Sequence, residues 1–177
     1  MRSLMVVFAL CAVPVFAGGP VAKALDEDLS NIERDIVPLA EAMSAAQYKF
    51  APSQGEFKGV RTFGLQVRHV ATVMYAVSAA VLGEKNPVSM GTSENGPDSL
   101  DGKAEIVKYL KDAFLYAHKA MASLTEKNLT DMVSTPFGSD KAPRIKMATV
   151  AVWHGFDHYG QMVVYARMNG VVPPASR

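Results

Sequence analysis

Three of the four histidines in this 177-residue chain are placed where they could share one metal ion. His154 and His158 lie four residues apart in a segment with helical patterning, so both rings project from one helix face, about 5–6 Å apart at Cβ. His69 lies in an earlier helix-like segment, on the face that also carries its apolar residues. Three imidazoles from two helices would leave coordination positions open, which is typical of a catalytic rather than a structural metal site.

Each of these histidines also has an ordinary structural explanation. A single inward-facing histidine is usually a hydrogen-bonded core residue, and two histidines four residues apart on a helix often occur by chance. The residues alone therefore favour a metal site and a plain helical core about equally. We assign no role to the fourth histidine, His118. We expect Asp157 to be a solvated or outer carboxylate, and Gln161 to pack in the helix or orient a ligand.

Four segments have the apolar periodicity of long helices. These segments cover about residues 21–48, 61–82, 101–126 and 144–169. Thr62 is a suitable cap for the second helix, and Gly83 and Gly170 should end the second and fourth. Pro38 is expected to kink or split the first helix. The connections between helices are rich in Gly, Pro, Ser, Asn or Asp and cover 47–60, 84–100 and 127–143.

Four long helices predict an all-α fold, an up-and-down four-helix bundle. In that arrangement the second and fourth helices begin at the same end of the bundle, which brings His69, His154 and His158 within a turn or two of one level. Connections 47–60 and 127–143 are then expected to overhang the site. The aromatic residues that could line a pocket there are Phe50, Phe57, Phe63 and Phe137.

The first residues of the chain have the layout of a cleavable secretory signal peptide. A positive charge at Arg2 precedes an apolar run, and small-residue cleavage patterns end at Ala17 and Ala24. The apolar run is too short to serve as a stable membrane anchor. We therefore expect residues 1–24 to be removed, residues 25–177 to form the domain, and the protein to be exported to the periplasm or secreted.

Composition narrows the classes of function. The whole chain has 18 basic and 17 acidic residues, and removing residues 1–24 takes away Arg2 and Lys23, so no basic surface for nucleic acid is expected. The single cysteine, Cys11, lies in the predicted signal, so the mature domain would hold no disulfide, cysteine nucleophile or covalent haem. The sequence contains no Glu-x-x-His, which disfavours a di-iron carboxylate bundle.

The histidine segments resemble the DinB superfamily, the DinB/YfiT-like metalloenzymes. The resemblance covers about residues 25–172. It is carried by Gln-Val-Arg-His-Val at 66–70, by His-Gly-Phe-Asp-His-Tyr-Gly-Gln at 154–161, and by the tail that follows at 165–174, which ends in Asn-Gly-Val-Val-Pro-Pro. It implies a four-helix bundle with one metal ligand from the second helix and two from the fourth.

By this resemblance, His69, His154 and His158 are the ligands of a divalent ion. Zinc suits three neutral imidazoles best, and nickel, iron or manganese remain open. Characterised members of the family include S-transferases and isomerases that use low-molecular-weight thiols, whereas an export signal departs from that cytoplasmic setting. The favoured function is a metal-dependent enzyme, hydrolase-like or thiol S-transferase-like, acting on a small molecule. No other catalytic or cofactor-binding residue is assigned.

Two other functions stay open on the sequence alone. One is a non-enzymatic periplasmic protein that binds a metal or a small ligand. The other is a bundle with non-covalent haem held by histidine and methionine. A homodimer is also expected, because the fourth helix is apolar almost all round. Its second apolar stripe, on the face opposite the one with the histidines, would need a partner to cover it. That stripe consists of Ile145, Val152, Phe156, Tyr159 and Val163.

Overall fold

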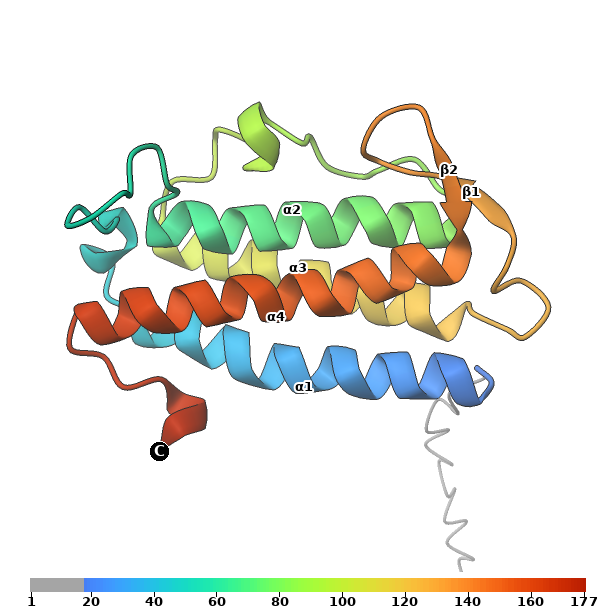
Figure 1. Ribbon diagram of the computed structural model, residues 1–177, viewed down its shortest axis with the longest axis horizontal. Coiled ribbons are helices and arrows are strands. Elements are labelled where there is room, and N and C mark those ends of the chain that lie inside the picture. Colours follow the sequence, from blue (N-terminus) through green and yellow to red (C-terminus); the bar gives the residue numbers. More distant parts are fainter. Residues whose placement is uncertain (1–17) are drawn as a thin grey trace, which may run out of the picture.

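The computed structural model describes residues 18–177, which form four long helices joined by three connections (Figure 1). The helices are α1 (Pro20–Ala42), α2 (Phe63–Leu82), α3 (Lys103–Ala122) and α4 (Arg144–Met168). Three short 3-10 turns are η1 (Gln47–Lys49), η2 (Thr92–Glu94) and η3 (Pro174–Ser176). The predicted all-α class with four helices is confirmed.

The connectivity differs from the predicted up-and-down order. α2 and α3 lie side by side and run in the same direction, as do α1 and α4 (Figure 1). Thr72 lies 3.1 Å from Tyr109 between the hydroxyl oxygens, and Glu84, just beyond α2, binds Lys119 near the end of α3 at 2.8 Å. The antiparallel neighbours are α1 with α3 and α2 with α4, so α1 and α2 are diagonally opposite. The up-and-down prediction was therefore wrong.

The connection between α2 and α3 makes this order possible. α2 has 20 residues and is about 30 Å long, whereas an extended chain covers about 3.3 Å per residue. Residues 83–102 can therefore return along the whole length of α2, and they do so across one side of the bundle (Figure 1). We call this segment the crossover. Apolar periodicity fixes the buried face of a helix but not its direction, so the sequence pattern fitted both orders.

Helix ends follow the capping residues closely. The Thr62 hydroxyl accepts a hydrogen bond from the Leu65 N–H at 3.3 Å, and Gly83 ends α2 with φ 70°. Gly170 likewise has φ 72° after α4. α1 continues through Pro38 without a break as far as Ala42, so the expected split of this helix does not occur.

The predicted signal peptide lies mostly outside the described residues, because the structure describes nothing before residue 18. α1 already begins at Pro20, and Ala22 is buried in the bundle. Cleavage after Ala24 would remove this buried first turn, whereas cleavage after Ala17 would leave α1 whole. The export prediction itself stays a prediction.

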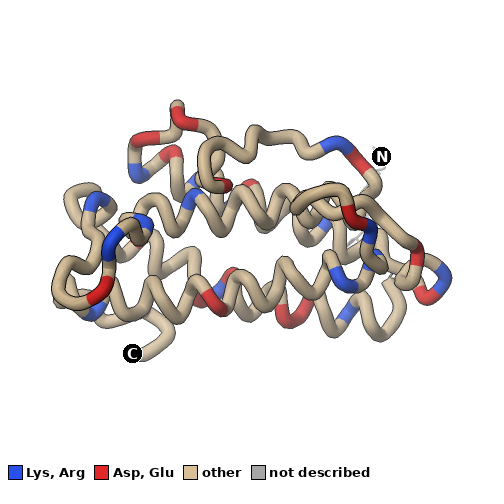
Figure 2. Tube along the Cα trace, turned by 45° about the horizontal axis from the view of Figure 1, so that its top comes forward, with Lys and Arg blue, Asp and Glu red and all other residues tan. Residues whose placement is uncertain are grey.

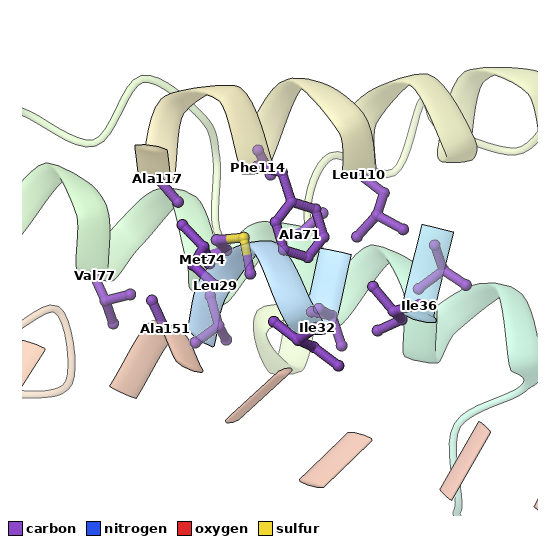
Figure 3. Packing of buried hydrophobic residues seen from close by; sticks show 14 of the residues in the cluster. Leu29, Ile32, Ile36, Ala71, Met74, Val77, Leu110, Phe114, Ala117 and Ala151 are labelled. Atoms are coloured by element: carbon purple, nitrogen blue, oxygen red, sulfur yellow. The ribbon is translucent and has the colours of Figure 1, made fainter. Parts of the chain in front are cut away.

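The core lies along the bundle axis and takes residues from all four helices (Figure 3). Phe114 of α3 and Met74 of α2 pack beside Leu29 and Ile32 of α1, each with at most 2% of its surface exposed. Burying one such side chain contributes about 1.5–3 kcal/mol. Because this core is apolar, polar side chains within it need hydrogen-bond partners. The polar side chains of α2 lie on the surfaces of the helix that face the crossover and α4.

A small hairpin precedes α4 and was not predicted. β1 (Met132–Ser134) pairs antiparallel with β2 (Lys141–Pro143), with Val133 opposite Ala142. Both of these residues are buried, whereas their neighbours along the strands are not. Strands of three residues give too short an alternation for a sequence pattern to detect. The hairpin fixes the connection 123–143 against the start of α4.

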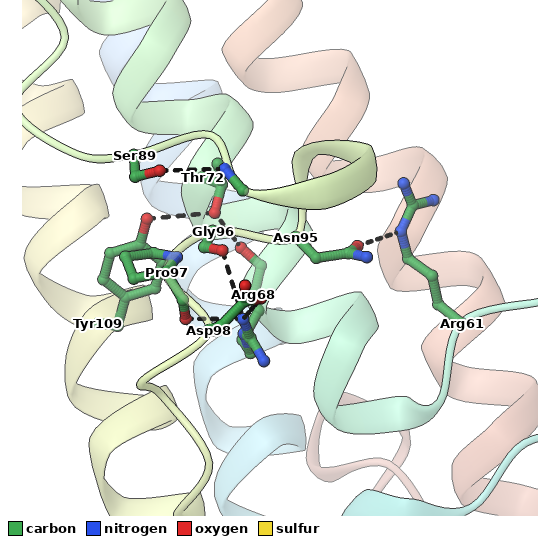
Figure 4. Close-up of polar contacts among 10 residues, drawn as sticks. Arg61, Arg68, Thr72, Ser89, Asn95, Gly96, Pro97, Asp98 and Tyr109 are labelled. Carbon is green, nitrogen blue, oxygen red and sulfur yellow. Dashed lines mark hydrogen bonds and ion pairs between the residues drawn. The ribbon is translucent and has the colours of Figure 1, made fainter.

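The crossover is held on α2 by polar contacts (Figure 4). The buried Arg68 donates from Nη2 to the carbonyl of Pro97 at 2.7 Å, and Thr72 donates to the Arg68 carbonyl at 2.8 Å. Gly96 has φ 74°, and a Cβ there would lie 2.5 Å from the Thr72 hydroxyl. This position therefore requires glycine, and the contact fixes the height at which the crossover passes over α2.

α2 combines high hydropathy with burial. It is long and apolar enough to cross a membrane, with a mean hydropathy of 1.3 over an 18-residue stretch. However, 83% of that stretch is buried inside the bundle. Arg68 is its only charged residue, whereas acidic and basic residues are interspersed over the other helices and the connections (Figure 2). α2 is therefore the core helix of the bundle, and its polar residues stand out.

Candidate metal centre

Three imidazole rings meet between α2 and α4, as the sequence predicts. The ring centroid of His69 is 5.0 Å from that of His154 and 4.7 Å from that of His158. The centroids of His154 and His158 are 4.4 Å apart. One ring nitrogen from each lies within 4.8 Å of the others. Nitrogens bound to one ion at about 2.0–2.1 Å would lie about 3 Å apart. The cluster can therefore close on a single ion with little movement.

The crossover orients His69. Its Nδ1 lies 3.0 Å from the carbonyl oxygen of Glu94. A carbonyl can only accept, so Nδ1 carries the proton and donates it, and the Nε2 lone pair is left free. That Nε2 lies 3.1 Å from the Nε2 of His154. The free lone pair of His69 is thus aimed into the centre of the cluster.

A chain of amides orients His158. Its Nδ1 lies 2.7 Å from the Oε1 of Gln66, and the Nε2 of Gln66 donates to Gln161 Oε1 at 3.0 Å. Gln161 in turn donates from Nε2 to the Asp157 carboxylate at 3.2 Å. Because the carboxylate can only accept, it sets the direction of both amides, and Gln66 must accept from the ring. His158 therefore also presents Nε2 to the cluster, in the manner of outer groups that orient metal-ligating histidines.

This chain gives Asp157, Gln161 and Gln66 their structural roles. The expectation that Asp157 is an outer carboxylate and Gln161 an orienting amide agrees with these contacts. Gln66 was not singled out as a functional residue. It is 3% exposed and lies three residues before His69, on the same side of an apolar helix. A buried amide in such a helix needs a partner, and this signal could have identified it.

The turn that carries Glu94 has an unusual backbone. Ser93 and Glu94 have φ 54° and 59°, in the left-handed region that costs a non-glycine residue of order 1–3 kcal/mol. Arg61 holds this turn from the other side, with Nη2 2.8 Å from the Ser93 carbonyl and Nε 2.7 Å from Asn95 Oδ1. The strained turn is thus fixed where its carbonyl meets His69.

Burial keeps the three rings uncharged. Desolvation, together with the neighbouring imidazoles and Arg61, lowers the pKa of His154 to about 3. Desolvation and the neighbouring His69 together lower the pKa of His158 to about 4. The pKa of His69 is also lowered, first by burial and then by Arg61. Neutral rings at neutral pH have the lone pairs that a metal ion requires.

Gly155 allows α4 to approach α1 next to the cluster. A Cβ on Gly155 would lie 3.0 Å from Cγ1 of Ile32, which is fully buried. A side chain at this position would therefore push α4 away from α1. Because His154 and His158 flank Gly155, their positions depend on this close contact.

A cavity of about 580 Å³ opens beside the cluster and includes His154 in its lining. Half of its lining residues are apolar, and residues of the connection 127–143 line it, as expected. The apolar residues are Val73, Phe137, Ala142, Met147, Val150 and Trp153, and the charged ones are Glu94, Asp140, Lys141 and Lys146. Glu94 lines the same cavity, so the crossover rather than connection 47–60 covers this side of the site. Connection 47–60 instead reaches a separate cavity, where Gly59 and Val60 line the wall together with Gln66 and Gln161.

The four aromatic residues proposed for a pocket have different positions. Phe137 lines the cavity. Phe63 is fully buried in the core, against Tyr48. Phe50 packs edge-on against Tyr165, and Phe57 is 40% exposed. One of the four therefore belongs to the site.

His118 lies apart from the cluster, between α1 and α3. Its Nδ1 is 2.6 Å from the Asp26 carboxylate and its Nε2 is 3.0 Å from that of Glu33. Burial alone would lower its pKa, but hydrogen bonds to the two carboxylates outweigh this and raise it. Both ring nitrogens are thus occupied, and this ring has no lone pair to offer a metal.

The fold and the three-histidine arrangement define a helical bundle with a candidate metal centre between α2 and α4. The sequence model of the DinB superfamily matches residues 28–162, well over half of the chain. The protein belongs to the DinB superfamily. This confirms the resemblance drawn from residues 66–70 and 154–161.

A solved structure gives the same fold. The chain is similar to a DinB-like protein from Bacillus cereus, with 18% sequence identity and a TM-score of 0.66. The similarity covers 86% of this chain and 95% of that one. At this identity the likeness establishes the fold alone. The comparison with curated proteins found no match.

Proposed function

We propose that the protein binds one divalent metal ion through His69, His154 and His158 and acts as a metal-dependent enzyme on a small molecule. The observation that carries the proposal is the set of hydrogen bonds on the far side of two rings. Glu94 and Gln66 occupy the Nδ1 atoms of His69 and His158, so Nε2 is left to coordinate. Hydrogen bonds alone would hold each ring in the core, but they would not require the Nε2 atoms of His69 and His154 to face each other at 3.1 Å.

The donor set suits zinc, since three neutral imidazoles are common zinc ligands; nickel, iron and manganese also accept imidazole. A bound divalent ion would act as a Lewis acid and lower the pKa of a coordinated water or thiol. The protein's own part is positional. Gln66 and the Glu94 carbonyl hold the rings, and the cavity beside His154 admits a small substrate and shields it from bulk water.

The cavity favours an enzyme over a storage or sensing protein. It reaches His154, so a substrate can approach the ligand set directly. The reaction class that we propose is hydrolysis, or transfer of a group to the sulfur atom of a thiol. The alternative is a non-enzymatic binder of a metal or small ligand. Tight, saturable binding with no exchangeable position on the ion would favour that alternative.

We also propose export and a homodimer. Export is supported by the signal-like start of the chain, and the mass of the cellular protein tests it, because an intact Met1 on most molecules contradicts it. The dimer is supported by four apolar side chains of α4 that are 40–55% exposed: Trp153, Phe156, Val164 and Met168. Of the stripe predicted to need a partner only Phe156 is among them, because Val152, Tyr159 and Val163 pack partly against the core. Light scattering of the purified protein tests it, and a monomer at micromolar concentration contradicts it.

Metal content tests the central proposal. The mature protein is purified without a histidine tag, and bound metal is measured for the wild type, His69→Ala and His154→Ala. We expect about one ion per wild-type chain and less than a tenth as much in either variant. His118→Ala is the matched control, since it removes an imidazole outside the cluster and should keep the wild-type content. Equal metal in all four proteins would remove the proposed site.

A further inference from the structure

A second cavity lies on the other side of the histidine cluster. Its volume is about 350 Å³. Along α2, Leu65 and Gln66 line this cavity, His69 follows, and Val73 lines the first cavity. α4 runs antiparallel to α2. Its residues Gln161 and Tyr165, which follow the two histidines in the sequence, therefore line the second cavity. The two cavities and the cluster between them thus form one row along the α2–α4 groove.

The two cavities differ in chemical character. Half of the residues that line the first cavity are apolar, and its charged residues have both signs, with Glu94 and Asp140 beside Lys141 and Lys146, whereas most of the side chains around the second are polar. The second contains a cation and no carboxylate among its lining residues. The residues that line it are Gly59, Val60, Arg61, Leu65, Gln66, Ser93, Asn95, Gln161 and Tyr165. An acidic ligand would meet no like charge in this lining.

Arg61 is the cation, and it is held rigidly. A guanidinium has five N–H donors in a planar fork. One donates to Asn95 Oδ1, which Figure 4 shows, and one to the Ser93 carbonyl. Three donors are left, and among residues 18–177 no carboxylate forms an ion pair with Arg61. A fixed fork with free donors is the arrangement that recognises a carboxylate or a phosphate.

The surroundings of Arg61 also favour an anion. Gln66 is in the first turn of α2, where the helix dipole is positive. The acid whose charge acts on Arg61 is Glu94, and this residue lines the first cavity rather than the second. Partial burial of Arg61 weakens its screening by water, which strengthens its attraction for an anion.

We propose that the second cavity binds the carboxylate of the substrate, so that the enzyme acts on organic acids with an apolar tail. Arg61 would hold the carboxylate, the first cavity would take the apolar part, and the reacting group would lie between them at the histidines. The catalytic meaning of this site rests on the proposed function, but anion binding by Arg61 does not require the metal.

Calorimetry on the full chain, freed of metal by a chelator, tests the anion site without competition from direct coordination. The probes are phenylbutyrate, the neutral phenylbutanamide and inorganic phosphate. We expect phenylbutyrate to bind the wild type at least tenfold more tightly than the amide. Arg61→Gln should weaken phenylbutyrate binding at least tenfold and leave amide binding unchanged. Arg34→Gln, which removes a charge from the exposed face of α1, is the control and should behave as the wild type.

Arg61→Lys guards against loss of the fold, because Arg61 also holds the crossover. It keeps the charge but not the fork, so we expect weaker binding than the wild type. Equal binding of acid and amide, or wild-type affinity in both Arg61 variants, overturns the anion site. Tighter binding of phosphate than of phenylbutyrate overturns the assignment to organic acids. Reloading the same preparations with zinc after the chelator is removed separates the proposals: a chain that takes up no metal but binds the acid through Arg61 contradicts only the metal centre.

Discussion

The two antiparallel helix pairs of the bundle place histidine in opposite environments. Between α1 and α3, His118 has a carboxylate on each ring nitrogen, and its pKa is raised. Between α2 and α4, His69 and His158 each have a neutral oxygen on Nδ1, and the pKa values of these two rings and of His154 are lowered. Burial favours the neutral ring in both places, and only the two carboxylates at His118 outweigh it, so that His118 holds a proton where the other three rings offer lone pairs.

The largest expected effect is on metal-dependent stability. Zinc at about 100 times its dissociation constant should stabilise the wild type by about 2.7 kcal/mol, and His158→Ala should remove this gain. His118→Gln should retain it, because both nitrogens of His118 are already engaged. Thermal unfolding with and without zinc measures the effect. A zinc-dependent shift that persists in His158→Ala would place the metal elsewhere.

The next effect concerns the orientation of one ring. Gln66→Leu removes the acceptor on His158 Nδ1 and should weaken metal binding about 10- to 100-fold. Competition with a chromophoric chelator gives the affinity. Ser78→Ala is the control, since Ser78 is also a buried polar residue of α2 but its hydroxyl has no hydrogen-bond partner. Unchanged affinity in Gln66→Leu would mean that the amide chain has no part in the site.

Substitutions of two glycines of α4 test how closely this helix packs against α1 beside the metal ligands. Gly155→Ala should lower the free energy of unfolding by about 1 kcal/mol, because the new methyl group meets the buried Ile32. Gly160→Ala meets nothing within 4 Å and should raise it by about 0.5–1 kcal/mol through helix propensity. Urea unfolding of the metal-free variants gives both values. Effects of the same sign would show that the contact between α4 and α1 at Gly155 has room for a methyl group.

The smallest effect is the pH dependence that His118 contributes. Its pKa in the folded state is raised above the usual 6.5, so its stabilisation is full below that value and is lost as pH rises through the folded pKa. The wild type should exceed His118→Gln by about 1 kcal/mol near pH 5.5, and the difference should shrink above neutral pH. Urea unfolding across this range measures it. A difference that grows with pH would contradict the two-carboxylate setting.

Much of the site could be predicted from local sequence signals. The spacing of His154 and His158 and the apolar face around His69 indicated convergence, and Thr62 and Gly83 marked the ends of α2. The prediction that the rings share one level is correct, although it assumed that α2 and α4 begin at the same end. His158 lies near the middle of α4, so its level changes little when the helix is reversed.

The parts that could not be predicted depend on contacts between distant residues. The path of the crossover is fixed by Arg68 and Gly96, which are 28 residues apart, and neither residue type indicates such a contact. The Glu94 carbonyl is a backbone group, so no side chain marks it as a partner of His69. The role of His118 required knowing that Asp26 and Glu33 lie opposite it.

The parallel placement of α2 and α3 also bears on how the chain folds. α1 and α2 are consecutive but diagonally opposite, so these first two helices share no extensive interface when they leave the ribosome. Thr72 and Tyr109, which join α2 to α3, are 37 residues apart, much farther than partners in a helical hairpin. Folding rate falls as contacts become less local. The bundle should therefore collapse only once α3 has been synthesised, and more slowly than a hairpin-built bundle of equal size.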